Sequence, residues 1–467
     1  MFYQNHHFLR RDTLDQRYIK CHYKTTHTDG EYVLYWMQHT QRFADNHALI
    51  AAIKAANSLD LPLKVVFNIV NDYPEGTARH YHFMLEGLQS LNEKLYNHGI
   101  DFNVTTGAFL DNLKPFIDDA AMLYIDKGYT RYLRQIRQTV IDYAKNQDCT
   151  TFEVESEVIV PVESASSKCE YAARTIRPKL LKLKDDFLHL YDTPKLKNKK
   201  ANKASQLNHA IETLIKPLNI DHTVKKTIYF KGGEDEALKQ LDAFIENGLN
   251  TYHESNDPSK DLTSKISPYL HFGMISPVRV YLAISDMEER MNTEAVDNYL
   301  EQLLIRRELA FNFVTYCEGY DTFDSMTDQW AYETMEIHLG DKRDYLYTEA
   351  DYLNLKTHDP YFNAAMKEMM VTGYMHNYMR MYWGKKIIEW SPSYEEAYTL
   401  MLTLNNRFFL DGRDPNSYAG VAWCFGRHDH GWKDRDVFGK LRYMNANGLK
   451  RKFDIDAYVT RINQLKE

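Results

Sequence analysis

The stretch YVLYWMQHTQRFADNHALIAAIKAANSLDLPLKVVFNIV, residues 32 to 70, decides the fold of the N-terminal part of the chain. It opens with the apolar run Tyr32–Met37, continues through an amphipathic segment around Ala44–Leu59 and closes with the run Lys64–Val70. Short apolar runs of this kind indicate buried strands, and the segment between them has helical periodicity. A strand, a helix and a second strand in this order predict a βαβ unit with parallel strands.

The same alternation continues to about residue 160. We expect a helix at about Gly76–His98 and further strands at Asp101–Val104, Ala121–Ile125 and Phe152–Val160. Alternating strands and helices predict a doubly wound, Rossmann-like parallel sheet with right-handed crossovers. Such sheets bind ligands at the carboxyl ends of their strands. No G-x-G-x-x-G string is present, so this sheet lacks a dinucleotide fingerprint.

Helical patterns dominate from about residue 205 to the end. Between the two regions, the lysine run Pro194–Lys203 in a turn-rich context indicates a linker or an exposed loop, with DNA contact as the less favoured alternative. We therefore expect an α/β domain over residues 1–185, a linker over 186–204 and an all-helical domain over 205–467. A chain of 467 residues is long enough for two such domains.

Composition limits the possible compartments and partners. The net charge of −8 argues against a protein that coats DNA generally, although a local basic face would suffice for specific binding. No apolar run is long enough to span a bilayer, and Met1–Arg11 has no signal-peptide core. The pairs His80/His82 and His428/His430 have no third ligand in metal spacing, so no metal site is expected.

The cysteines indicate a reducing environment. They are odd in number, scattered and without a C-x-x-C pair, which favours a reduced, cytoplasmic protein over a disulfide framework. The five positions are Cys21, Cys149, Cys169, Cys317 and Cys424.

The segment His376–Phe453 carries most of the functional information. Trp383 and Trp390 are seven residues apart on a helical pattern, so they share a face about 10 Å apart along the axis. A polar turn at 411–416 follows between apolar runs, and residues 427–452 hold eight Lys and Arg against three Asp. Buried tryptophans, a polar turn and a cationic aromatic surface indicate an aromatic cofactor that faces a polyanion.

This segment resembles the class II cyclobutane-pyrimidine-dimer photolyases of the photolyase/cryptochrome superfamily. The matching strings are MRMYWGKKIIEW, LDGRDPNSY, VAWCFGRHD and GKLRYMNANGLKRKFD, and weaker resemblance covers nearly the whole chain. The resemblance implies blue-light-driven repair of pyrimidine dimers in double-stranded DNA, by electron transfer from reduced FAD to a flipped-out dimer. It also implies that the α/β domain can hold an antenna chromophore, whose identity stays open.

The resemblance places the FAD site in the helical domain. The string TSKISPYLHFG, from Thr263 to Gly273, resembles the segment that holds the FAD phosphates; alone, it would indicate a simple helix start. Arg380 and Asp411 match the ion pair beside the flavin ring, and Asn405 matches an asparagine that faces flavin N5, with a helix cap as the alternative. The implied FAD contacts are Tyr252, Ser264, Ile266, Ser267, Arg380, Asn405, Asp411, Arg413, Asp414 and Asn416.

Gln38, Gln41, Arg42 and Asn46 match the family's pattern after the first strand. Their alternative interpretation is a helix start with solvated polar groups.

The electron relay departs from the family pattern. Trp383 and Trp390 match two relay tryptophans, but the third position, in THDPYFN, holds Phe362. Phenylalanine is much harder to oxidise, so we expect a broken or rerouted relay. Tyr361 is the first substitute to consider, followed by Tyr374, Tyr378 and Tyr382, although all of these rings could instead be core aromatics.

The substrate contacts depart from the pattern twice. Trp423 and Met381 match residues that wall the dimer, but Gln302 replaces a glutamate that contacts it. Glutamine keeps the shape and loses the charge-assisted hydrogen bond, so slowed or altered repair is expected. Ser255 replaces an arginine that fills the space left by the flipped lesion. We accordingly assign catalytic roles to Gln302, Met381, Trp423 and Asn405.

The basic segment predicts a duplex clamp through phosphate contacts, with a solvated surface as the alternative. The predicted DNA-binding residues are Arg427, Lys433, Lys440, Arg442, Lys450 and Arg451. A monomer is expected. The three departures also support a second hypothesis: a photolyase-like flavoprotein with weak or no repair, acting as a light or redox sensor or a DNA-binding regulator.

Overall fold

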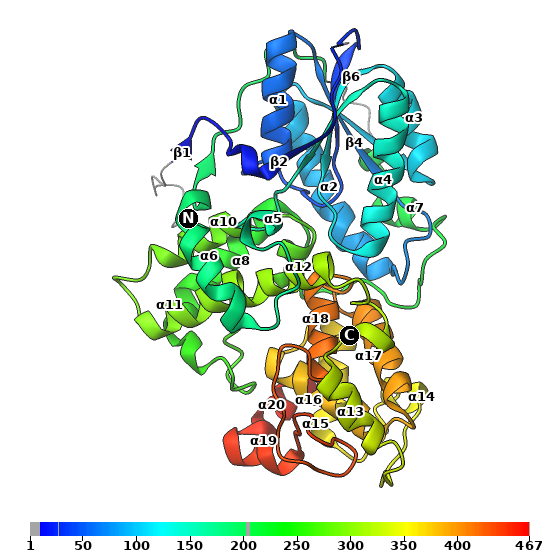
Figure 1. The fold of residues 1–467 in the computed structure, drawn as a ribbon, viewed down its shortest axis with the longest axis vertical. Coiled ribbons are helices and arrows are strands. Elements are labelled where there is room, and N and C mark those ends of the chain that lie inside the picture. The colour runs from blue at the N-terminus through cyan, green and yellow to red at the C-terminus, as the bar shows by residue number, and fades with distance from the viewer. Residues whose placement is uncertain (1–9, 27, 202–205, 467) are drawn as a thin grey trace.

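The computed structural model describes residues 10–26, 28–201 and 206–466. It has an α/β part at the top of Figure 1 and a larger helical part below it. The predicted fold class, a parallel-sheet domain followed by a helical domain, is confirmed. In the described part of the chain no helix is long and apolar enough to cross a membrane.

The main sheet has the strand order β2-β7-β6-β3-β4-β5. Its four inner pairings are parallel, as predicted, but β2 runs antiparallel to β7 along one edge. The sequence IKCHY of β2 is half-exposed, so it lacks the apolar pattern that would have revealed this strand. The strands are β1 (Arg10–Arg11), β2 (Ile19–Tyr23), β3 (Tyr32–Trp36), β4 (Leu63–Ile69), β5 (Asp101–Thr106), β6 (Ala120–Asp126), β7 (Thr150–Val154) and β8 (Leu190–Tyr191).

Helices cover both faces of the sheet. As a result, every residue of β3 is buried. Leu34 and Trp36 point to the cluster formed with α3 (Phe109–Asp118) and α4 (Arg131–Asn146). Val33 and Tyr35 point to the opposite cluster, which α1 (His47–Leu59) and α2 (Ala78–Asn97) complete. This two-sided burial explains why the strand reads as a continuous apolar run.

The helical part contains all remaining long helices, and they follow the predicted helical patterns. Two short elements matter for the site: the 3-10 helix η3 (Leu249–Glu254) and a π-helical turn η4 (Glu301–Arg306). The helices are α5 (Val162–Ala165), α6 (Ala173–Phe187), α7 (Ile211–Ile215), α8 (Glu234–Asn247), α9 (Ser267–His271), α10 (Pro277–Ser285), α11 (Thr293–Leu300), α12 (Arg307–Tyr316), α13 (Gln329–Ile337), α14 (Glu349–Leu353), α15 (Pro360–Thr372), α16 (Asn377–Trp390), α17 (Tyr394–Phe408), α18 (Pro415–Cys424), α19 (Ala446–Lys452) and α20 (Ile455–Asn463).

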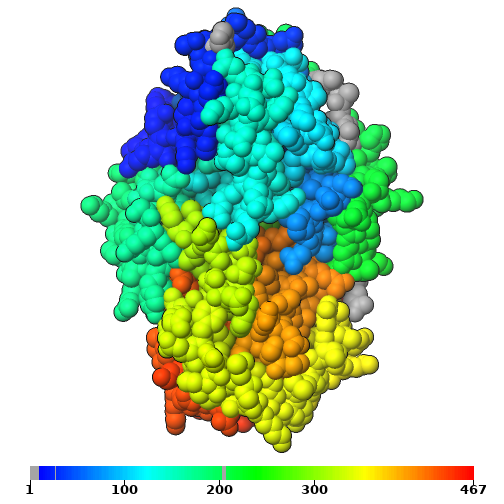
Figure 2. Space-filling view, turned by 45° about the vertical axis from the view of Figure 1, so that its right-hand side comes forward, coloured from blue at the N-terminus to red at the C-terminus, as the bar shows by residue number. Residues whose placement is uncertain are grey.

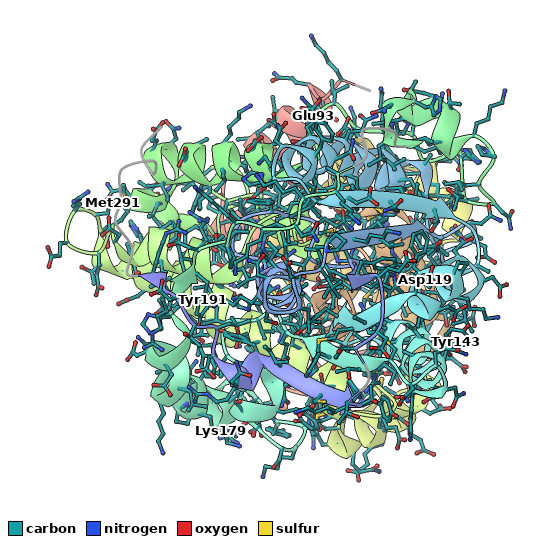
Figure 3. The ribbon with its side chains drawn as sticks, turned by 90° about the horizontal axis from the view of Figure 1, so that it is seen from above. Glu93, Asp119, Tyr143, Lys179, Tyr191 and Met291 are labelled. Atoms are coloured by element: carbon teal, nitrogen blue, oxygen red, sulfur yellow. A yellow bond between two sulfur atoms is a disulfide. The ribbon has the colours of Figure 1, made fainter. Side chains whose placement is uncertain are left out.

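Residues 173–191 span the end of the predicted α/β domain and the start of the predicted linker, and they contact both parts. Helix α6 lies against η4, and its Arg177 forms an ion pair with Glu301 at 2.6 Å. β8 pairs with β1, and Figure 3, seen from above, shows Tyr191 near α1, where its ring meets that of His47. Of the predicted linker, residues 202–204 lie outside the described residues.

The two parts meet through a buried polar network. Arg42 is almost fully buried and donates to the Glu157 carboxylate at 3.2 Å and to the Gly273 carbonyl at 2.9 Å. Burial raises the pKa of Glu157 to about 7, although Arg42 opposes this shift. Gly273 has a φ of +62°, and a Cβ there would lie 1.8 Å from the His39 carbonyl oxygen. The backbones therefore meet directly, and Figure 2 shows the N-terminal part seated on the helical part.

The predicted strand Phe152–Val160 ends early, at Val154, because the residues after it serve this junction. The amides of Ile159 and Val160 donate to the carboxylate of Glu308 on α12. Burial raises the pKa of Glu308 to about 8.

The expectation of reduced cysteines is wrong for one pair. Cys169 and Cys317 form a disulfide across 148 residues, which joins the segment before α6 to the end of α12. Their separation in sequence hid the pair, since only folding brings the two positions together. The cysteine argument for a reducing compartment therefore fails. Cys21, Cys149 and Cys424 are free.

Candidate functional site

A cavity of about 380 Å³ lies within the helical part, in the size range of ligand pockets. Its walls come from η3, the start of α9, the π turn η4, the start of α16 and the turn that leads into α18. Nine of the predicted site residues line it: Tyr252, Ser264, Ile266, Ser267, Gln302, Arg380, Asp411, Asp414 and Asn416. Ser255, one of the departures from the family pattern, lines it as well.

Arg380 and Asp411 form a two-pronged ion pair at the cavity wall. The Arg380 Nη2 donates to both carboxylate oxygens of Asp411, at 3.0 and 3.1 Å, and its Nε donates to the Met375 carbonyl at 3.1 Å. The guanidinium also stacks over the Phe409 ring, 3.9 Å from its centroid. These contacts fix a cation and an anion side by side, so a bound ring would meet a preorganised dipole.

The opposite side of the cavity is aromatic and hydroxyl-rich. Tyr252 meets Tyr299 edge to face at 5.1 Å, and the Tyr299 hydroxyl donates to Ser264 Oγ at 3.3 Å. Ser267 starts α9, immediately before Pro268. Proline fixes the start of the helix without an N–H, and the adjoining backbone amides lie beside the cavity. The predicted phosphate-binding segment is thus brought to the cavity.

The π turn η4 presents Gln302 to the cavity. Single π turns inside helices are frequent at functional sites because they re-aim side chains. Arg307 follows at the start of α12, lines the same cavity and is more than nine-tenths buried. Its Nη1 is buried without a hydrogen-bond partner among the described protein atoms. A buried guanidinium nitrogen of this kind calls for an anionic partner.

Asp414 lines the main cavity and is bound to His271, which lines a second cavity. It caps α18 through the Asn416 amide, and the His271 imidazole donates to it at 3.2 Å. Burial alone would raise the pKa of Asp414, but the hydrogen bond and charge of His271 outweigh it and lower the pKa to about 2. Asp414 is therefore a carboxylate throughout the physiological range.

The second cavity, of about 100 Å³, lies between the strand ends of the sheet and the helical part. Gln38 and Gln41 line it, together with Tyr73, His271 and Arg413. The other two residues of the predicted antenna pattern do not. Arg42 is bound to Glu157, and Asn46 caps α1, but both are buried and not solvated as the alternative interpretation expected.

Four predicted site residues do not line the main cavity. Arg413 turns to the second cavity and donates to the carbonyls of Glu75 and Asn406. Asn405 is buried and donates to the Asn406 side chain at 3.0 Å. Met381 and Trp423 are half-buried on the aromatic side of the helical core, and Arg442 stacks over the Trp423 ring at 5.3 Å. Their predicted roles stay predictions.

The predicted relay residues surround the outer end of α16. Trp383 and Trp390 are almost fully buried; Trp383 Nε1 donates to Met366 Sδ at 2.9 Å, and Phe362 touches Trp390 at 5.1 Å between ring centroids. Both Met366 and Phe362 belong to α15, which Asp359 caps. Tyr361 points elsewhere, since its hydroxyl donates to Asp456 at 2.8 Å.

The basic segment divides into buried and exposed residues. Arg427 is buried, paired with Asp328 at 2.8 Å and placed against both disulfide sulfurs. It is therefore not available on the surface for a phosphate. Arg442 is half-buried, and its guanidinium also stacks on the exposed Trp432 at 4.9 Å. The remaining predicted DNA-binding residues are exposed: Lys433, Lys440, Lys450 and Arg451.

Comparison with known proteins agrees with this geometry. The chain is 43% identical over 442 residues to a protein of Methanothermobacter thermautotrophicus named deoxyribodipyrimidine photo-lyase, covering 94% of this chain and 96% of the relative. This chain belongs to the DNA photolyase family. The family described as DNA photolyase matches residues 33–198. An Arabidopsis thaliana photo-lyase is 37% identical, covering 93% of this chain and 89% of the relative.

Solved photolyase structures share the fold of this family member. A bacterial class III photolyase from Agrobacterium tumefaciens superposes with a TM-score of 0.72 at 19% identity, covering 93% of this chain and 86% of the other. A photolyase from Sulfolobus tokodaii, whose structure holds two FAD molecules, gives a TM-score of 0.68 at 14% identity, covering 92% of this chain and 89% of the other.

The sequence did not predict Arg307 and His271 as site residues, because a single Arg or His in a helical pattern carries no signal of its neighbours.

Proposed function

We propose that this protein is a class II photolyase that repairs cyclobutane pyrimidine dimers in double-stranded DNA under blue light, with FAD as its cofactor. The observation that carries the proposal is the fixed Arg380–Asp411 pair in a cavity lined by the residues that the family resemblance assigned to FAD. The names of the relatives support the reaction, and the matching strings support the class.

The residues present fit the cofactor. The buried Arg307 Nη1 lacks a partner that a phosphate would supply, and Tyr252, Ser264 and Ser267 offer hydroxyls along the same wall. Arg380 and Asp411 would flank the flavin ring. Bound there in its reduced form, FAD would supply the light-driven electron that opening of the dimer requires.

The protein's own groups would position the dimer and stabilise charge. The Arg380 guanidinium, held by Asp411, stabilises negative charge in the adjoining cavity. The Gln302 amide can both donate to and accept from the thymine carbonyls and N–H groups, but it cannot release a proton. The cavity is open to solvent at the exposed Gln302 and Asn298, so the bound cofactor and dimer would themselves exclude water there.

The duplex would lie on the exposed basic residues 433–451, as the resemblance predicts. Trp432, Arg442 and Trp423 form a continuous stack from the surface inward, with the guanidinium 4.9 Å and 5.3 Å from the two ring centroids. Aromatic and guanidinium planes suit unstacked bases, and phosphate contacts supply affinity. A flipped-out dimer is easier to extract than an intact pair because its stacking and pairing are already weakened.

A sensor without repair is the second candidate function. Three departures favour it: Phe362 in the relay, Gln302 at the dimer contact and Ser255 at the space behind the lesion. Ser255 and Gln302 both line the main cavity, so their chemistry bears directly on substrate handling.

Repair by chemically reduced enzyme separates the two functions. Protein with FAD reduced by dithionite is mixed with an oligonucleotide duplex that contains one thymine dimer, and intact thymines are counted after blue light and in the dark. We expect light-dependent repair, and an Asp411→Asn variant should lose most of it. Photochemistry and DNA binding without any repair would instead support the sensor. A (6-4) photoproduct duplex in parallel fixes the lesion preference.

The second cavity is our candidate site for an antenna chromophore, at the strand ends where such sheets bind ligands. We further propose that the protein acts as a monomer. Extraction of pigments from purified protein and light scattering test these two points.

A further inference from the structure

An exposed aromatic cluster continues the path of the buried tryptophans to the surface. Helix α16 carries Arg380 at the main cavity, then Trp383, then Trp390 at its far end. Beyond Trp390 lie the rings of Tyr345, Tyr347 and His358, which we call the outer cluster. The Trp390 ring meets Tyr347 at 5.3 Å and His358 at 5.2 Å between centroids.

The outer cluster reaches solvent within one ring. Tyr345 stacks on His358 with 3.9 Å between centroids and is 48% exposed, and His358 is also exposed. Trp390, in contrast, is 2% exposed. An electron that passes from the outer cluster to Trp390 thus moves from a solvent-exposed site to a buried one. This inward direction is the one required to reduce a buried cofactor.

The hydrogen bonds of Tyr347 fix the position of its proton. The His358 backbone N–H donates to Tyr347 Oη at 3.1 Å, and Oη lies 2.8 Å from His358 Nδ1. Oη accepts one hydrogen bond from the backbone N–H, and in the His358 tautomer that leaves Nδ1 unprotonated the phenolic proton is donated to Nδ1. The phenol and the imidazole therefore form a ready donor–acceptor pair.

We propose that Tyr347 and His358 act together as the terminal, proton-coupled electron donor of this protein, in place of the tryptophan that Phe362 replaces. When Trp390 has lost an electron inward, Tyr347 gives one electron to Trp390 and its phenolic proton to His358 Nδ1. Trp390 is restored, Tyr347 becomes a neutral radical and His358 becomes an imidazolium. An external thiol later returns one electron and one proton to the tyrosine, and His358 releases its extra proton to solvent.

The proton acceptor is what makes tyrosine suitable here. A tyrosine that loses an electron also loses its phenolic proton. Without a proton acceptor nearby, its oxidation is therefore slow. After transfer, the positive charge rests on His358 at the solvent edge, and return of the electron requires return of the proton. The pair therefore slows charge recombination.

Other tyrosines near the relay are less suited. The Tyr361 hydroxyl is committed to Asp456, away from the tryptophans. Tyr382 is fully buried and its hydroxyl donates to Asp359, so a proton that it released would stay in the core and not at the solvent edge. Tyr345 touches His358 through its ring faces and so offers no hydroxyl to Nδ1.

Two measurements test the proposal. The first detects the radical by EPR and uses bound FAD, so it rests on the proposed function; the second needs no flavin. Protein with oxidised FAD is illuminated and frozen, and its EPR spectrum is recorded with and without ring-deuterated tyrosine. We expect a tyrosyl signal that is lost in Tyr347→Phe, lost or strongly delayed in His358→Gln, and retained in the matched control Tyr345→Phe. A signal that survives in Tyr347→Phe, or vanishes in Tyr345→Phe, overturns the proposal.

Nitrogen NMR of the flavin-free protein tests the hydrogen bond itself. We expect His358 Nδ1 to report an unprotonated acceptor whose resonance shifts in Tyr347→Phe and stays in Tyr345→Phe; a protonated Nδ1 contradicts the proposed proton position. Dithionite-reduced Tyr347→Phe should still repair dimers. If the reduced wild-type protein also fails to repair dimers, the proposed function is wrong. If repair occurs but the radical signal is unaltered in Tyr347→Phe, only the proposed role of the Tyr347–His358 pair is wrong.

Discussion

The rings of Phe362 and Trp390 are in edge-to-face contact, with centroids 5.1 Å apart and planes at 68°. An oxidisable ring at position 362 would therefore lie beside Trp390, at the outer end of the relay. Phe362→Trp should speed light-driven flavin reduction, because tryptophan gives up an electron far more easily than phenylalanine. The measurement is the rate of flavin bleaching under blue light with excess thiol. Phe362→Leu serves as control, and an unchanged rate in Phe362→Trp would show that the current bypasses this position.

The same substitution should weaken the fold. Phe362 is fully buried and also touches Tyr352, at 5.0 Å between centroids. A larger ring in a filled core typically costs about 1–3 kcal/mol. Thermal melting separates this effect from the change in photochemistry.

Gln302→Glu should increase dimer repair per absorbed photon. A carboxylate or carboxyl at this cavity position can form a charge-assisted hydrogen bond, which exceeds a neutral one by about 1 kcal/mol, or roughly fivefold in rate. Repair is measured on dithionite-reduced enzyme, so that the relay plays no part. Asn298→Asp, which places a carboxylate elsewhere on the cavity wall, is the matched control. Equal gains from both variants would mean that only the cavity's charge matters.

Asp414→Asn should lower the free energy of unfolding by about 2 kcal/mol at pH 7. Its folded pKa of about 2 lies below the unfolded value of about 3.9, so its stabilisation is complete above pH 4. The contribution should fade as the pH drops from about 4 through 2. Asparagine keeps the helix cap, so the difference reports the charge. Denaturant melts of both proteins at pH 7 and pH 3 check this, and an equal gap at both would contradict it.

The Cys169–Cys317 disulfide should hold the fold closed across a long loop. Disulfides typically contribute about 2–4 kcal/mol, and the chain-entropy model gives about 5 kcal/mol for a loop of 148 residues. The double variant Cys169→Ser/Cys317→Ser should melt earlier, whereas Cys21→Ser, at an exposed free cysteine, should not. Titration of the denatured protein without reductant should find the three free thiols, Cys21, Cys149 and Cys424. Five thiols in that titration would refute the bridge.

Lys450→Ala and Arg451→Ala should weaken DNA binding through salt-dependent contacts. Each lost phosphate contact reduces the slope of log affinity against log salt by about 0.9. Arg427→Ala should instead destabilise the fold, because its guanidinium is buried on Asp328 and the disulfide. Binding isotherms at several salt concentrations, beside melting curves, distinguish these outcomes. A normal melt with a reduced slope for Arg427→Ala would reverse this assignment.

The sequence predicts the parts of this fold whose signal is local. The apolar run of β3 and the helical period of α16 are recognisable because burial and helix geometry act over neighbouring residues. The edge strand β2 is half-polar, so its sequence does not predict a strand. The predicted strand ends at Val154 because the following backbone amides donate to Glu308, which lies far along the chain.

The site follows the same division. The motif strings identified Arg380, Asp411 and Gln302 as site residues, and the structure places all three in one cavity. Tyr347 and His358 carried no signal, because a tyrosine and a histidine eleven residues apart mean nothing until the chain between them turns back. The disulfide is a further case, since its partners are 148 residues apart.

The π turn at Glu301–Arg306 has a consequence for how this chain can change by evolution. A π turn holds one more residue than the α turn it replaces, so it works as an inserted residue within an otherwise regular helix. Deletion of one residue there would leave a plausible, continuous α-helix, yet rotate everything on one side of it by about 100°. Arg307 would leave the cavity and Glu308 would leave the junction together. Substitutions can accumulate at these positions one at a time, but the length of this segment is not free to vary.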